Sequence, residues 1–66
     1  MTYSQAELTE AKRQIDSMLH KLRETVKTLN AKENSERYKS QITLAERRIR
    51  ALEISIALIE NELGTQ

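Results

Sequence analysis

The chain has 66 residues, with no cysteine, no proline and one glycine, and its 11 lysines and arginines against 10 aspartates and glutamates leave a formal net charge of +1. The lack of cysteine excludes disulfides and thiolate metal sites, and the balanced charge gives no strong overall attraction to nucleic acid or an anionic membrane. No apolar run reaches the roughly 18 residues of a membrane span, and the first residues lack the basic and apolar regions of a signal peptide. We therefore expect one small cytoplasmic domain.

A first helix is predicted from Gln5 to about residue 31. Ser4 and Glu7 have the spacing of a capping box, in which each side chain satisfies the backbone N–H of the other, and Tyr3 can pack on Leu8 as a hydrophobic staple. Apolar residues then recur in alternating steps of three and four, with Leu19 and Val26 on one flank. The predicted seam of this helix comprises Leu8, Ala11, Ile15, Met18, Leu22 and Leu29, with Thr25 as a weak member.

The polar segment 30–35 interrupts the apolar pattern. Asn34 tolerates the left-handed conformation that closes a helix, and Ser35 can cap the next one. We therefore predict a turn at about 32–35 and a second helix at about 36–63, stopped by Gly64. Two helices of similar length joined by a short turn favour an antiparallel hairpin that includes the whole chain, 1–66. One continuous helix stays an open alternative, because the segment contains no proline.

The second predicted helix carries a coiled-coil seam. Its apolar residues follow the spacing 4-3-4-3-4-3-4 without a gap, the pattern that keeps one stripe of a helix against a partner helix. The members of this seam are Tyr38, Ile42, Ala45, Ile49, Leu52, Ile56, Ile59 and Leu63. The fold class predicted is thus all-α, a coiled-coil-like antiparallel two-helix hairpin.

A second apolar stripe lies behind this seam and consists of Leu44, Ala51, Ile54, Ala57 and Leu58. A hairpin gives each helix one neighbour, so it leaves this stripe uncovered, whereas two hairpins packed as a four-helix bundle would cover it. We predict a homo-oligomer that uses these residues as its interface. Alternatively, the stripe belongs against another helical protein, which would make this chain half of a heteromeric bundle.

Few residues suggest chemistry. Asp16, His20 and Glu24 lie one turn apart on the first helix, but no other segment supplies an identifiable further metal ligand. The serines have no histidine at a recognisable spacing, and there is no glycine-rich phosphate loop. We therefore expect no enzyme, no cofactor, no metal site and no small-molecule substrate, and predict a protein–protein interaction or scaffolding module.

The alternative function is that of a small nucleic-acid-associated regulator. Arg47, Arg48 and Arg50 form a local basic cluster that an oligomer could repeat along a phosphate backbone. Glu46 and Glu53 stand within one turn of Arg50, and such mixed charge on a coiled-coil flank more often sets partner orientation. The interaction module remains the first hypothesis.

The segment Tyr38–Leu63, which begins YKSQITLAERRIRALEI, resembles a class of short uncharacterised helical-hairpin proteins of Gram-positive bacteria. The resemblance covers about half of the chain and implies a helical hairpin, with no known activity or site residues. Small proteins of this kind often occur near phage or mobile-element genes, which implies a regulatory or scaffolding adaptor.

Overall fold

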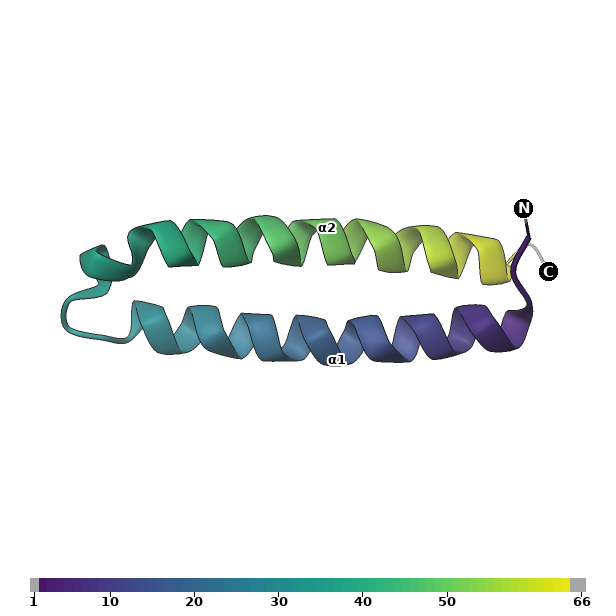
Figure 1. Ribbon diagram of the computed structural model, residues 1–66, viewed down its shortest axis with the longest axis horizontal. Coiled ribbons are helices and arrows are strands. Elements are labelled where there is room, and N and C mark those ends of the chain that lie inside the picture. Colours follow the sequence, from purple (N-terminus) through teal and green to yellow (C-terminus); the bar gives the residue numbers. More distant parts are fainter. Residues whose placement is uncertain (1, 65–66) are drawn as a thin grey trace.

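The computed structural model describes residues 2–64 as two antiparallel helices, α1 (Gln5–Asn30) and α2 (Lys39–Gly64). They lie side by side along their whole length and are joined at one end by a short loop and a single 3-10 turn, η1 (Ser35–Tyr38) (Figure 1). The hairpin measures 48 × 15 × 15 Å. The predicted all-α two-helix hairpin is confirmed, and the alternative of one continuous helix is wrong.

Helix α1 begins at Gln5, as predicted, because its first turn is capped by side chains. The Ser4 hydroxyl accepts from the Glu7 amide at 3.1 Å, and Glu7 Oε1 accepts from the Ser4 amide at 3.0 Å. These two bonds satisfy N–H groups that have no partner within the helix. The hydrogen bond from the Ser4 backbone, followed by that with its side chain, lowers the pKa of Glu7.

The turn differs in detail from the prediction. Helix α1 ends at Asn30, where the amide of Ala31 bonds to the carbonyls of Lys27 and Thr28 at 3.2 and 3.3 Å. Asn34 has φ −106° and makes no side-chain cap, and no described residue has a positive φ. Tightened backbone turns thus take the place of the left-handed closure expected at Asn34.

The second helix also starts differently from the prediction. The backbone re-enters helical geometry through η1, with the Arg37 amide donating to the Asn34 carbonyl at 3.0 Å, so that α2 begins at Lys39 and not near residue 36. Ser35 is the first residue of η1 and not its cap. Across the loop, Lys32 Nζ lies 5.7 Å from the centre of the Tyr38 ring, a cation–π contact. At the other end, α2 includes Gly64 in ordinary helical conformation.

The seam between the helices is shifted on α1 relative to the prediction. Met18 is 46 % exposed and Thr25 is exposed, whereas Leu19 is 4 % exposed and Val26 is partly buried. Both versions of the seam share four residues spaced seven apart: Leu8, Ile15, Leu22 and Leu29. Between them, the observed seam uses Leu19 and Val26 in place of Met18 and Thr25. On α2 the predicted seam lies inward, with Ala45 buried and the other members partly buried.

The hairpin is extended for its mass. Its accessible surface is 5369 Å², against about 4300 Å² expected for a compact 7.7 kDa monomer. Its radius of gyration is 15.0 Å, against about 11 Å for a compact chain of this length. Among residues 2–64, only Leu8, Leu19 and Ala45 are buried, and each of them is still 4–7 % exposed. Two helices alone therefore enclose very little core.

The observed seam predicts that Leu19→Ala lowers the free energy of unfolding by about 2 kcal/mol or more, because it opens a cavity at the most buried side chain. Thr25→Ala, at an exposed position of the rejected seam, should change it by less than about 0.5 kcal/mol. Urea unfolding at one fixed protein concentration measures both. A larger loss from Thr25→Ala than from Leu19→Ala would contradict the seam described here.

The capping box predicts a pH dependence. The pKa of Glu7 is lowered in the folded chain from its usual 4.5, so Glu7 binds a proton more readily in the unfolded chain than in the folded one. The ionised carboxylate therefore contributes to stability above about pH 4.5. The contribution is lost as the pH falls through the lowered pKa. Wild type should therefore lose more stability between pH 6 and pH 3 than Glu7→Gln, as followed by circular dichroism during thermal unfolding. Equal losses would contradict the role of the carboxylate.

Candidate interaction surface

The two faces of the hairpin differ, and one of them is held by ion pairs between the helices. Lys12 Nζ lies 3.6 Å from Glu60 Oε2, and Arg23 Nη2 donates to Glu53 Oε2 at 2.8 Å. Within α2, Arg50 Nη1 makes a longer contact with the same Glu53, at 3.8 Å. These pairs are partly exposed to solvent, so each stabilises the hairpin by at most about 1 kcal/mol. We call this side the ion-paired face.

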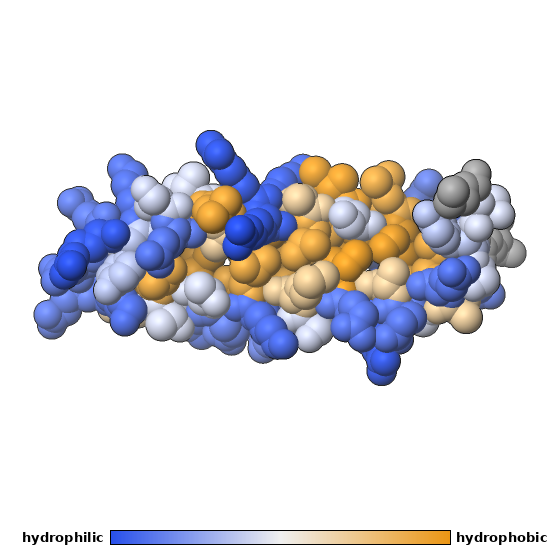
Figure 2. Space-filling model, viewed as in Figure 1, coloured by the Kyte–Doolittle hydropathy of each residue, from blue (hydrophilic) through white to orange (hydrophobic). Residues whose placement is uncertain are grey.

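The opposite side, which we call the apolar face, contains an open groove of about 480 Å³ between the helices. Its floor is apolar and comes from both helices, and one cationic side chain of each helix completes its lining. The lining residues are Met18, Lys21 and Leu22 of α1 and Arg48, Ala51 and Leu52 of α2. Hydrophobic side chains form a band along the middle of the hairpin, while hydrophilic ones gather at the loop end (Figure 2).

All five residues that the sequence predicted for an oligomer interface are exposed. Leu58 is 66 % exposed, Leu44 48 % and Ile54 46 %, and Ala51 and Ala57 are also classed as exposed. They do not form one narrow stripe. At 100° per residue, Ile54 lies opposite the buried Ala45, and Ala57 lies toward the ion-paired face. Leu44, Ala51 and Leu58 are thus the members on the side of the groove.

Met18 is the surface residue that the sequence analysis missed. It was placed in the seam, but the structure turns it into the groove beside Ala51. Its flexible, polarisable side chain suits an adaptable contact surface. The sequence offered a second seam, because Leu19 follows directly, but the spacing did not choose between the two. The apolar face is therefore built from both helices and not from α2 alone.

The three arginines of the alternative function do not converge. Arg48 lines the groove, Arg47 lines a separate depression with Lys39, and Arg50 lines a third one with Glu53. Successive residues of a helix are rotated by 100° about its axis, so the three arginines, which are close in sequence, point in different directions around α2. Within residues 2–64 the three arginines thus lie in three different depressions.

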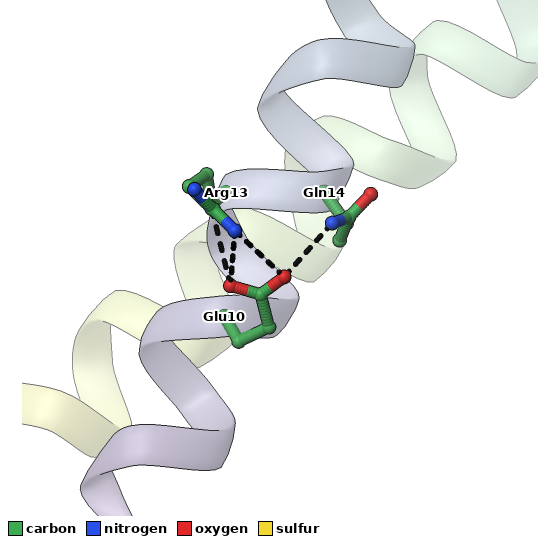
Figure 3. Close-up of polar contacts among 3 residues, drawn as sticks. All are labelled: Glu10, Arg13 and Gln14. Atoms are coloured by element: carbon green, nitrogen blue, oxygen red, sulfur yellow. Dashed lines mark hydrogen bonds and ion pairs between the residues drawn. The ribbon is translucent and has the colours of Figure 1, made fainter.

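The densest polar cluster lies on the outer surface of α1. Arg13 donates to the Glu10 carboxylate from Nε and Nη2, both at 3.1 Å, and Gln14 Nε2 donates to Glu10 Oε1 at 2.8 Å (Figure 3). The bonds from Arg13, followed by the one from Gln14, lower the pKa of Glu10, and Glu10 in turn raises that of Arg13. All three residues come from neighbouring turns of one helix, so this exposed cluster stabilises α1 locally.

The remaining groups do not assemble into a site for a metal. Within residues 2–64, no three histidine, aspartate or glutamate side chains are grouped so as to hold an ion, and this includes the set around His20. No described helix is long and apolar enough to cross a membrane.

No match was found when the chain was compared with protein families, with curated proteins and with solved structures. No family is therefore identified for it. Of what the resemblance noted above implies, the structure shows the two-helix hairpin.

Proposed function

We propose that this chain is a non-enzymatic protein–protein interaction module that self-associates through the exposed apolar side chains of α2. The observation that carries the proposal is the exposure of Leu44, Ile54 and Leu58 in a chain whose own core is minimal. Exposed apolar patches of this kind on a small helical protein mark association surfaces.

The energy available from covering these side chains is large for so small a protein. Full burial of an aliphatic side chain is worth about 1.5–3 kcal/mol, so covering the exposed parts of Leu44, Ile54 and Leu58 contributes about 2–5 kcal/mol in all. Natural domains are stable by about 5–15 kcal/mol. Association therefore supplies a substantial share of the stability that this hairpin needs.

The accessible surface area of the hairpin also supports association. Its surface exceeds that of a compact monomer by about 1000 Å². A standard protein interface buries about 800 Å² on each partner. Packing a second hairpin against this one would thus remove approximately the excess and produce a four-helix bundle. The open form of the depressions supports a binding role over catalysis, since enzymes enclose their substrates in water-excluding sites.

The double substitution Ile54→Glu with Leu58→Glu should reduce the assembly to monomers, because it places two charges where apolar contacts are proposed. Sedimentation equilibrium measures the mass, and circular dichroism reports whether the monomer remains helical. The matched control, Ser17→Glu with His20→Glu, adds the same charge at exposed positions of α1 and should keep the wild-type mass. A double variant of α2 that sediments like wild type would contradict the assigned interface.

Dilution provides an independent prediction. If folding and association are coupled, a hundredfold dilution costs a dimer about 2.7 kcal/mol. For two chains of this size that corresponds to a fall of about 10 °C in Tm. Thermal unfolding at two concentrations a hundredfold apart measures it. A Tm independent of concentration, with a monomeric mass at both, would contradict self-association.

A further inference from the structure

Two stripes of matching spacing lie on the apolar face, and the two residues of each stripe nearest the loop line the groove. The stripe of α1 consists of Glu7, Ala11, Gln14, Met18 and Lys21, in steps of 4-3-4-3. The stripe of α2 consists of Arg48, Ala51, Ser55, Leu58 and Glu62, in steps of 3-4-3-4. Each sequence of steps keeps its residues on one side of a helix. Each stripe has an acidic residue at one end and a basic residue at the other. Between them stand two apolar residues, with one polar residue, Gln14 or Ser55, in the middle.

The hairpin sets the two stripes beside one another in rows. Met18 and Lys21 share the groove with Ala51 and Arg48, which places the two cations at the same height. Leu8 lines one depression together with Leu58 and Glu62. Because Glu7 directly precedes Leu8, Glu7 and Glu62 lie at about the same level along the long axis of the hairpin. The apolar face therefore has a basic edge in the middle of the hairpin and an acidic edge near the ends of the chain.

Across each row a large side chain stands beside a small one. Met18 lies beside Ala51 in the groove, and the equal spacing of the stripes pairs Ala11 with the prominent Leu58 in the row nearer the ends. Gln14 and Ser55 form the central row. Large and small side chains thus alternate on the apolar face. Two copies of such a surface can pack together with the large side chains of one against the small side chains of the other.

We propose that the occupant of this face is a second copy of the chain, packed face to face with the hairpins pointing in opposite directions. The inference rests on the proposed self-association and adds its orientation and register. A twofold axis that crosses the central row places Leu58 over the partner's Ala51 and Met18 over the partner's Ala11. A large side chain then meets a small one at every apolar position.

The same axis joins opposite charges. Arg48 and Glu62 are 14 residues apart on α2, and Glu7 and Lys21 are 14 residues apart on α1, or roughly 21 Å in each case at 1.5 Å per residue. Arg48 therefore meets the partner's Glu62, and Lys21 meets the partner's Glu7. Neither cation has an ion pair within residues 2–64. The capping box engages Oε1 of Glu7, and a carboxylate can accept further bonds at its second oxygen.

Charge excludes the other face-to-face arrangement. If the hairpins pointed in the same direction, α1 would cover α2 of the partner row by row. Lys21 would then meet the partner's Arg48, and Glu7 would meet the partner's Glu62, with like charges at both edges. The apolar rows fit equally well in both arrangements, so like-charge repulsion decides against this one. Of the three exposed residues of α2 named above, the antiparallel dimer covers Leu58, whereas Leu44 lies beyond Arg48 toward the loop, outside the overlap, and Ile54 lies on the side of α2 opposite the seam.

Single cysteines test the orientation, since the chain has none of its own. In the antiparallel dimer Ser55 faces the partner's Ser55, so Ser55→Cys should form a covalent dimer on mild oxidation, as seen by mass under non-reducing conditions. The control Ser17→Cys, on the outer surface of α1, reports random collision and should stay largely monomeric. In the parallel dimer, a mixture of Ser55→Cys with Gln14→Cys would cross-link and Ser55→Cys alone would not.

Charge reversal provides a test of sign. Arg48→Glu sets a carboxylate against the partner's Glu62 in the antiparallel dimer and should weaken dimerisation roughly tenfold, whereas Arg48→Glu with Glu62→Arg should restore it. In the parallel dimer Arg48→Glu would face the partner's Lys21 and tighten binding. If Arg48→Glu tightens dimerisation, the proposed orientation is wrong. The orientation is also wrong if the wild type is a dimer but the Ser55→Cys variant does not cross-link. In both cases self-association itself still holds. A wild type that is monomeric at all concentrations overturns the proposed function as well.

Discussion

Each helix of the hairpin has a single neighbour, and this constraint governs the rest of the structure. A helix that packs against one partner buries one stripe of its surface, here centred on Leu19 of α1 and Ala45 of α2. Any apolar residue outside that stripe stays in water, however regular its spacing. Leu58 is therefore two-thirds exposed although it lies in the same helix as the seam. The exposed apolar face is a direct consequence of folding a chain with apolar residues on more than one side of each helix into only two helices.

Much of the fold could be predicted because its determinants are local. The capping box of Ser4 and Glu7 fixes the start of α1, and the uninterrupted 4-3 spacing on α2 fixes its inward side. The loop was predicted less well, since Asn34 and Ser35 suit a left-handed closure and a cap that the backbone does not use. Bonds between neighbouring backbone groups close the turn without either side chain, and no residue preference reports such bonds in advance.

The candidate surface was predicted in part, for a reason that lies in α1. Its apolar stripe is wide enough for two overlapping seams, one through Met18 and one through Leu19, and spacing alone does not choose between them. The choice is made by packing against α2, and the observed seam brings the partly buried Lys12 beside Glu60, with Nζ 3.6 Å from Oε2. Once Leu19 turns inward, Met18 turns outward. The contribution of α1 to the apolar face follows from this choice.

In the proposed dimer, affinity and orientation come from different residues of the apolar face. Covering the apolar side chains is worth several kcal/mol, but the alternation of large and small residues fits a second copy in either direction. An exposed ion pair is worth at most about 1 kcal/mol, which is too little to drive association by itself. It is enough to select between two arrangements whose apolar rows fit equally well, because the rejected one replaces attraction by repulsion at each edge. A net charge near zero therefore conceals an ordered distribution, with Lys21 and Arg48 at one height of the hairpin and Glu7 and Glu62 at another.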